Sequence, residues 1–429
     1  MLKTVLGLVA LAVCLGAPVG AAQTFRAAAL KVDITPESPQ WLLGYGARQS
    51  TGVHDRIYHR ILALDDGENR FVLVSSGLGG ISPAEYDKVA AELERRTGIP
   101  RLNFWWSMTH THSAPEVGTP GLPAAFLGDR YQHEVEPEYT AMVEQRLLDG
   151  VARVLEQLEE ARLAVGWGFS LANINRRARD VEGETRLGMN PGGPTDRRVG
   201  LLRFEDPSGQ PIALLANYPI HGTVLGGANL EISGDAPGVV ADYVESKLGA
   251  PLVFLNGAAG DQAPLYSVFP DPRSGHLSQF RHLLGKPIIE ANRRMQETTS
   301  DVRLSVSEVI VETPKKDGLD WPDELRNYAK IQGSETLIKL PIRILQLNEE
   351  IAIWSAPLEL FSQIAVRVRS HSRFPYTFFG GYTNGWLGYL LTADEWQHGG
   401  YEPRVSPYTP QAQFDVEKAV GAALDALPR

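Results

Sequence analysis

The chain has 429 residues, of which 43% are hydrophobic and 21% are charged. This composition is that of an ordinary globular protein, and it excludes a disordered or fibrous chain. The formal net charge of −10 argues against a polyanionic partner such as nucleic acid, because binding to phosphate groups needs clustered Lys and Arg side chains.

The first 22 residues have the pattern of a secretory signal peptide. Lys3 gives a positive start, residues 5–15 are almost entirely apolar, and the small residues at 20–22 offer a cleavage site. The apolar run is too short to favour a transmembrane helix, and no later stretch approaches the length of a membrane span. Because Cys14 is the only cysteine, we expect a secreted or periplasmic mature chain without thiols or disulfides.

Beyond residue 22, the pattern of apolar residues predicts strands and helices in loose alternation. Strands are predicted at 27–33, 57–65, 71–76, 102–108, 164–175, 199–204, 211–219, 252–256, 303–312 and 343–354. Helices are predicted at 137–160, 236–248, 277–299, 358–371 and 412–426. Because several strands follow one another without a helix, we predict an α/β fold with mixed β-sheets flanked by helices. The lack of repeats and linkers favours a single domain over residues 23–429.

Polar residues follow several predicted strands, at the point where each strand ends. They are His110 and His112 after LNFWWSM, His221 after IALLANYPI, Asp261 in the block after PLVFL, and Glu359 after IAIWSAP. In α/β proteins ligands gather outside strand ends, because the rigid sheet positions short loops there. On an extended segment residues i and i+2 point to the same face, so the His-x-His pair could converge on one metal ion. Each histidine could instead be an ordinary polar residue whose hydrogen bonds are satisfied.

Several common enzyme signatures are absent from the sequence. It contains no HExxH helix, no Gly-x-Ser-x-Gly elbow, no P-loop and no GxGxxG. Their absence argues against the commonest zinc proteases, serine hydrolases and nucleotide enzymes. From its residues alone, the chain is an α/β protein with a suspected site of histidines and carboxylates.

A series of short blocks along the chain is shared with a known family. In order they are KVDIT, LLGYG, THTHSAP, NINRR, IHGTVLGGANLEISGD, AAGDQAP, APLE and TNGWLGYLLTADEWQHGGYEP. THTHSAP resembles the THTHSGP block of the neutral ceramidases, zinc amidases that split ceramide into sphingosine and a fatty acid. The resemblance spans nearly all of the mature chain and implies the catalytic domain of that family. Since the chain ends at Arg429, we expect no C-terminal immunoglobulin-like domain, which larger members carry.

The resemblance implies a zinc site and its ligands. The family's two histidines, glutamate and tyrosine fall on His110, His221, Glu359 and Tyr389. Two neutral imidazoles and a carboxylate leave zinc Lewis acidic, and the phenol could bind zinc or hydrogen-bond a developing oxyanion. Glu359 could instead cap the helix predicted after it, and Tyr389 could belong to the core.

The remaining roles that the resemblance implies concern proton transfer and substrate contacts. His112 is expected to support the metal ligands or to carry a proton, and the candidate catalytic residues are His112, Tyr389 and Asp261. Arg176 of the NINRR block matches the family's substrate-site arginine and would hold a polar head group. Ala263 would lie at the substrate.

The chain departs from the family at its substrate contacts. Ala263 stands where the family has a serine beside the scissile amide, and Gly226 and Gly227 replace two asparagines. We expect a zinc-dependent amide hydrolase that uses zinc-activated water to cleave ceramide or another N-acyl lipid. The alternatives are a zinc hydrolase of the same fold acting on a different amide or ester, and a ligand-binding relative without turnover.

Overall fold

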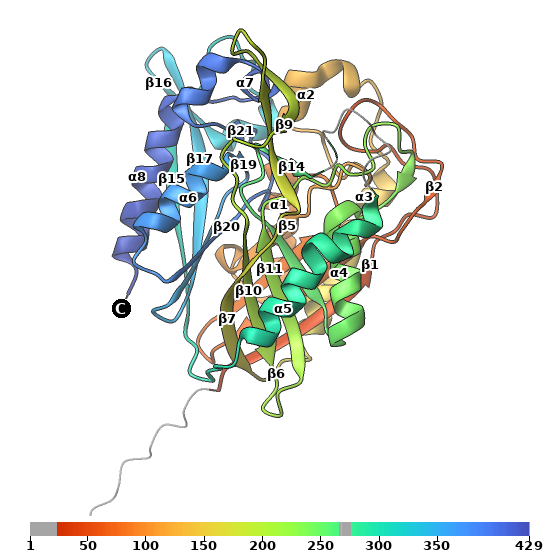
Figure 1. Ribbon diagram of the computed structural model, residues 1–429, viewed down its shortest axis with the longest axis vertical. Helices are drawn as coiled ribbons and strands as arrows, with labels where there is room; N and C mark the ends of the chain where they lie inside the picture. The colour runs from red at the N-terminus through yellow and green to blue at the C-terminus, as the bar shows by residue number, and fades with distance from the viewer. Residues whose placement is uncertain (1–23, 266, 268–275, 429) are drawn as a thin grey trace, which may run out of the picture.

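The computed structural model describes residues 24–265, 267 and 276–428. Three larger mixed sheets form the body of the protein, and helices lie along their outer faces (Figure 1). The predicted signal peptide, with Cys14, lies outside the described residues. The predicted α/β fold with mixed sheets flanked by helices is confirmed.

The first sheet has the strand order β5-β4-β3-β1-β6. Its strands are β1 (Arg26–Asp33), β3 (Tyr58–Asp65), β4 (Arg70–Ser76), β5 (Phe104–Met108) and β6 (Glu159–Glu160). Helix α1 (Pro83–Thr97) and the short η1 (Arg101–Asn103) connect the parallel strands β4 and β5, while α3 (Pro137–Leu155) packs on β1 and β3. Strand β5 therefore ends directly before the loop that carries the histidine pair.

The second sheet has the order β13-β11-β10-β7. It contains β7 (Arg162–Phe169), β10 (Arg198–Glu205), β11 (Pro211–Tyr218) and β13 (Leu252–Asn256). Helix α4 (Asp235–Leu248) lies between the parallel strands β11 and β13, and α5 (Lys286–Arg294) packs on β7 and β10. Two short helical segments, η3 (Leu277–Gln279) and η4 (Arg281–Gly285), precede α5. His221 follows the end of β11.

The third sheet has the order β15-β17-β18-β20, with β16 paired to β17. Its strands are β15 (Leu304–Pro314), β16 (Ala329–Gln332), β17 (Glu335–Leu347), β18 (Ile351–Ser355) and β20 (Tyr376–Gly380). Helices α6 (Ser362–His371) and α8 (Gln411–Ala426) pack against each other, with α8 on β15 and α6 on β20 (Figure 1).

Smaller pairings connect the ends of these sheets. One is the three-stranded sheet β14-β8-β9, formed by β8 (Asn173–Arg179), β9 (Thr185–Asn190) and β14 (Gln262–Pro264). The other two are pairs: β19 (Glu359–Leu360) with β21 (Tyr389–Leu390), and β2 (Gly52–Val53) with β12 (Glu231–Ile232). The remaining elements are α2 (Leu122–Leu127), η2 (Gly128–Arg130), η5 (Asp323–Tyr328), η6 (Ala393–His398) and α7 (Tyr401–Arg404).

The three larger sheets share an apolar core. Leu73, Leu215 and Ile353 come from different sheets and lie in one buried cluster. Trp105 and Trp106 are neighbours in β5, and because successive strand residues point to opposite faces they belong to different clusters. Strand β5 is thus covered on both sides, which holds its end, and the histidine loop after it, in a fixed place.

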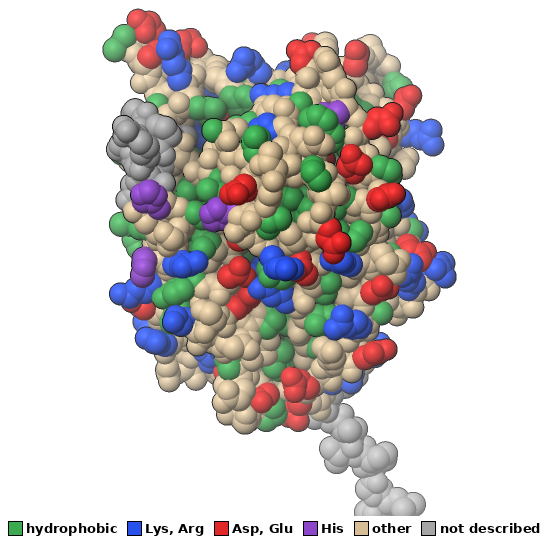
Figure 2. Space-filling view, turned by 90° about the vertical axis from the view of Figure 1, so that its right-hand side faces the viewer, with side chains coloured by type: hydrophobic (Ala, Val, Ile, Leu, Met, Phe, Trp, Pro, Cys, Tyr) green, Lys and Arg blue, Asp and Glu red, His purple; other side chains and the backbone are tan. Residues whose placement is uncertain are grey.

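One face of the molecule carries side chains of both charges (Figure 2). Figure 2 shows acidic and basic side chains interspersed over the face that it presents. Within the described part of the chain, no helix combines the length and the apolar character needed to cross a membrane.

Several predicted boundaries are wrong where two apolar elements follow each other closely. The predicted strand 164–175 is two strands, β7 and β8, separated at residues 170–172, and the predicted strand 343–354 includes a turn at Asn348, whose φ is 56°. The alternation of apolar and polar residues continues across such short turns, so this pattern alone does not reveal the turns.

Three helix boundaries are also corrected. The helix predicted at 137–160 ends at Leu155, that predicted at 358–371 begins at Ser362, and that predicted at 277–299 consists of three short helical segments ending at Arg294. Helix α1 was not predicted, although the Ser82 hydroxyl accepts a hydrogen bond from the Ala84 amide and Gly98 ends the helix at φ 73°.

Candidate active site

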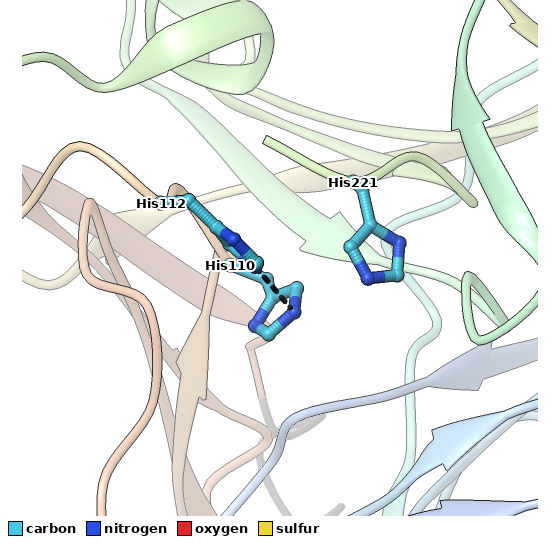
Figure 3. Close-up of side chains that lie close together, drawn as sticks. All are labelled: His110, His112 and His221. Carbon is cyan, nitrogen blue, oxygen red and sulfur yellow. Dashed lines mark hydrogen bonds between the residues drawn. The ribbon is translucent and has the colours of Figure 1, made fainter. Parts of the chain in front are cut away.

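Three histidines from two loops lie together at the ends of β5 and β11 (Figure 3). One nitrogen from each of His110, His112 and His221 lies within 4.8 Å of the other two, so this group could hold a metal ion. The loops are joined by backbone hydrogen bonds, since the His112 amide donates to the Gly222 carbonyl (2.8 Å) and the Gly222 amide donates to the His110 carbonyl (3.1 Å). The cluster therefore depends on the contact between the first and second sheets.

Gly222 permits that contact because it has no side chain. A Cβ atom at this position would lie 2.5 Å from Cα of Thr111 and 2.8 Å from the carbonyl oxygen of His110. Backbone atoms cannot yield to such an overlap, so only glycine lets the two histidine loops approach this closely.

Glu359, in the short strand β19 that follows β18, brings a carboxylate to the same cluster. Its Oε2 lies 3.0 Å from Nε2 of His221 and 3.4 Å from Nε2 of His110. Its Oε1 accepts a hydrogen bond from the Trp386 indole (2.7 Å), and the Tyr382 hydroxyl donates to Oε2 (3.3 Å). Glu359 lies in β19 and makes no capping bond to α6, so the alternative role as a helix cap is wrong.

Backbone carbonyls fix the tautomers of two histidines. Nδ1 of His110 lies 2.6 Å from the Gly79 carbonyl, and Nδ1 of His221 lies 2.9 Å from the Gln262 carbonyl. A carbonyl only accepts, so each Nδ1 carries a proton, and the Nε2 of each neutral ring has the lone pair that can bind a metal ion. Metal-binding histidines are commonly oriented by such contacts to the other ring nitrogen. These donors fit a divalent cation.

Burial and neighbouring charges favour the protonation states that a metal ion requires. Burial and then the Arg176 cation lower the pKa of His221 to about 4. Burial and then the neighbouring His110 and His221 lower the pKa of His112 well below its ordinary value. Burial alone would raise the pKa of the Glu359 carboxyl, but His110 and His221 hold it well below its usual range. Neutral imidazoles beside an ionised carboxylate are the forms that bind metals.

Arg176 joins Tyr389 to the cluster. Its Nη1 lies 2.9 Å from Nε2 of His221, and its Nη2 donates to the Tyr389 hydroxyl at 3.0 Å. Burial, followed by the charge of Glu359, raises the pKa of Tyr389 well above its ordinary value, so the phenol keeps its proton. The predicted metal ligands thus lie in one buried region, with Tyr389 connected to the histidines through Arg176.

Asp261 and Ala263 lie close in sequence to a residue that orients His221, but they make structural contacts. Oδ1 of Asp261 accepts from the Ser362 amide (2.8 Å), and Oδ2 accepts from the Ser362 hydroxyl and the Asn175 amide group (both 3.1 Å). Burial raises the pKa of Asp261 to about 6. Ala263 is buried in β14, next to Gln262, whose carbonyl holds His221. The catalytic role of Asp261 and the substrate role of Ala263 stay predictions.

Sequence reasoning missed Tyr382 and Trp386. The His110 ring stacks on Tyr382 with ring centres 4.1 Å apart, and both residues adopt left-handed backbone conformations with φ of 63° and 51°. Asn384, also left-handed at φ 64°, is bound to the backbone of β5. Non-glycine residues with positive φ are uncommon and concentrate at functional sites. The aromatic residues around Gly380 and Gly381 were the signal available in the sequence.

A cleft that is partly open to solvent leads to the cluster. His110, His112, Glu359 and Tyr389 line it. Its walls are largely apolar and include Leu43, Ile81, Val117, Leu127, Val135 and Trp386. Such a cleft suits a long apolar group held beside a polar centre.

The fold and the cluster define an α/β protein with a candidate metal-binding site at an apolar cleft. Residues 25–275, more than half of the chain, match the family described as neutral/alkaline non-lysosomal ceramidase, N-terminal. The chain belongs to this family, which confirms the family inferred from the sequence blocks.

Individual relatives agree with this assignment. The chain is 28% identical to the neutral ceramidase of Pseudomonas aeruginosa over 258 residues, which are 56% of this chain and 37% of that protein. It is 30% identical to neutral ceramidase A of Dictyostelium discoideum over 261 residues, which are 57% of this chain and 34% of that protein. The matched part thus spans little more than a third of these relatives.

Solved structures show the same fold over nearly the whole chain. The crystal structure of the Pseudomonas aeruginosa neutral ceramidase matches with a TM-score of 0.77 and 20% identity, covering 95% of this chain and 75% of that one. A ceramidase complexed with C2 matches with a TM-score of 0.76 and 20% identity, covering 95% of this chain and 76% of that one.

Proposed function

We propose that this protein is a zinc-dependent amide hydrolase that cleaves the N-acyl bond of ceramide or a related N-acyl lipid. The observation that carries the proposal is the convergence of two oriented imidazole lone pairs and one carboxylate at an apolar cleft. Membership in the neutral/alkaline ceramidase family supports the amide as the bond that is cleaved.

His110, His221 and Glu359 would hold the zinc ion, with Tyr389 at a fourth, weaker position. Zinc fits this set because it prefers nitrogen and oxygen donors in tetrahedral sites that keep one position exchangeable. When bound there, zinc would supply Lewis acidity and lower the pKa of water.

The surrounding residues would bind and orient the substrate. The apolar walls of the cleft would take the acyl chain and exclude water from the polar centre. Tyr389 keeps its proton and would donate a hydrogen bond to charge that develops on the amide oxygen. His112, with Nε2 3.2 Å from Nε2 of His110, lies beside the proposed ligands and would be the proton carrier. Arg176 would hold polar groups of the substrate.

Metal analysis combined with hydrolysis assays tests this function. Purified protein should contain about one zinc per chain and hydrolyse N-acyl sphingosine, while His221→Ala and Glu359→Ala should lose both properties, since removing one of three strong ligands undoes the site. A circular dichroism spectrum like that of wild type would show that the variants fold. Full hydrolysis by chelated His221→Ala would contradict the proposal.

A second candidate is hydrolysis of a different amide or of an ester. It is favoured by Ala263, which stands where the family has a serine, and by Gly226 and Gly227 in place of asparagines. Assaying ceramides beside short N-acyl amines and esters separates the two candidates by their relative kcat/KM.

We also propose that residues 1–22 direct export to the periplasm or beyond the cell. The proposal is supported by Lys3 and the apolar run that follows it. Mass spectrometry of exported protein should find a chain that begins near Ala22 or Gln23, and an intact Met1 would contradict this.

A further inference from the structure

A fully buried carboxylate lies between two consecutive arginines beside the site. Glu402, in α7, has 0% exposure. Its Oε1 accepts a hydrogen bond from Nε of Arg176 (3.0 Å), and its Oε2 accepts from Nη1 of Arg177. Burying a charged side chain costs free energy even when it is paired, and apolar residues of similar size would fill the same space. The three buried charges therefore point to a role other than packing.

A β-bulge allows both arginines to reach the same carboxylate. Consecutive residues of a strand normally point to opposite faces of the sheet. The pairing of β8 with β9 shifts register between Asn175 and Arg177, so that Arg176 lies in the irregular step. Bulges turn side chains toward new directions and are frequent next to active sites. The Arg176 amide is bound to the Asp261 carbonyl (2.9 Å), which fixes the bulged backbone.

The two arginines differ in what else they contact. Arg177 is anchored away from the histidines, because its Nε donates to Glu395 (2.8 Å) and its Nη2 donates to the Gly399 carbonyl (2.9 Å). The nitrogens of Arg176 have one protein partner each: Nε has Glu402, Nη1 has His221 and Nη2 has Tyr389. Glu402 is therefore the carboxylate that sets the plane of the Arg176 guanidinium.

We propose that Glu402 is a positioning residue that holds the Arg176 guanidinium on the Tyr389 hydroxyl and beside His221, and thereby fixes a cation next to the proposed metal ligands. Glu402 acts through Arg176, because its hydrogen bonds are to the two arginines. This role of Glu402 deepens the proposed function. The kinetic test of the role rests on the proposed function, because it measures hydrolysis.

The first test is structural and needs no substrate. Glu402→Gln keeps the shape of the side chain and removes its charge, and Glu395→Gln is the matched control because Glu395 pairs with Arg177 and Arg179 but not with Arg176. Crystal structures should show the Arg176 guanidinium displaced from the Tyr389 hydroxyl in Glu402→Gln and unmoved in Glu395→Gln. An unmoved Arg176 in Glu402→Gln would overturn the proposal.

The second test is a double-mutant cycle of hydrolysis. Glu402→Gln should lower kcat/KM about ten- to a hundredfold, as expected for a lost charge-assisted hydrogen bond. In an Arg176→Ala background it should lower kcat/KM less than about twofold, because coupled residues are not additive. If Glu402→Gln lowers kcat/KM by the same factor in wild type and in Arg176→Ala, the two residues act independently. That result would indicate a general structural role for Glu402 and overturn the proposal.

Two further measurements keep the tests decisive. If Glu402→Gln does not fold, Glu402→Asp retains the charge on a shorter arm, and the same crystallographic and kinetic criteria apply. If wild-type protein hydrolyses none of the N-acyl lipids or short amides and esters, the proposed function fails, while the crystallographic comparison still decides the role of Glu402.

Discussion

At the scale of single residues, Trp386 orients the Glu359 carboxylate of the site through a hydrogen bond. Its indole N–H donates to Oε1 of Glu359 at 2.7 Å. We predict that Trp386→Phe lowers zinc affinity about ten- to a hundredfold, because partners that orient a ligand contribute that much to metal binding. Competition with a chelator of known affinity measures the change. Trp396→Phe is the control, since the Trp396 N–H has no hydrogen-bond partner among the described residues, and equal losses in both variants would contradict the prediction.

A second residue-scale prediction separates chemistry from recognition at Ala263. Ala263→Ser restores a hydroxyl at the position of the family serine without altering a predicted metal ligand. Zinc content should be unchanged, and the ratio of kcat/KM for ceramide to that for other amides should change about two- to tenfold, the effect of one hydrogen bond. An unchanged ratio would place residue 263 outside substrate contact.

A third residue-scale prediction concerns His59, which is buried in β3 away from the cleft. Burial lowers the pKa of His59 to about 4, from an ordinary value of 6.5. The unfolded chain therefore binds more protons between these values, and the contribution of the neutral ring to stability is complete above pH 6.5 and falls as the pH drops toward 4. The loss is at most about 3 kcal/mol.

Thermal unfolding at pH 7 and pH 4.5 checks this sign. Wild-type Tm should fall between the two pH values by more than that of His59→Gln, which cannot take up the proton. His371→Gln, at an exposed position on α6, is the matched control and should keep the wild-type dependence. A steeper dependence in His59→Gln than in wild type would reverse the assigned direction.

At the scale of elements, the contact between the two histidine loops is the sensitive point. We predict that Gly222→Ala lowers Tm and abolishes zinc binding, since its Cβ would overlap the backbone of Thr111 at 2.5 Å. Gly421→Ala in α8 is the control, because a Cβ there meets nothing within 4 Å and alanine favours a helix by about 1 kcal/mol over glycine. Zinc binding by Gly222→Ala at wild-type affinity would show that the loops tolerate separation.

The elements also show how far sequence reasoning reaches. The bounds of long apolar strands such as β10 and β13 were predicted to within about one residue. Strands that are buried on both faces have nearly continuous apolar sequences, which are easy to recognise. Glu359 was placed by resemblance to a family, but its two-residue strand β19 was assigned to a helix. A strand that short has no period of its own, and its partner β21 lies 30 residues later, so tertiary contacts alone define it.

At the scale of the whole molecule, the cleft sets which substrates can reach the site. Leu127 lies on the wall of the cleft, in α2. We predict that Leu127→Trp lowers kcat/KM for long N-acyl chains more than for N-acetyl substrates, because the larger ring takes space that a long chain needs. Phe414→Trp, at an exposed position on α8, should leave the ratio unchanged. Equal losses for both chain lengths would place the acyl chain elsewhere.

The overall site was only partly predictable. His110, His221, Glu359 and Tyr389 are brought into one region as the sequence blocks implied, whereas Glu402 was read only as part of a block. The role proposed for Glu402 depends on the bulge in β8 and on the burial of the Glu402 side chain. The local sequence around residue 402 predicts neither.

The site draws its side chains from segments that follow all three larger sheets, and this has a consequence for synthesis. The histidines come from residues 110–221, whereas the carboxylates and the phenol come from 359–402. A nascent chain that has not yet emerged to residue 402 lacks part of the constellation. The growing polypeptide therefore cannot assemble the proposed metal site until the last strands and α7 have been synthesised and have packed around the cleft.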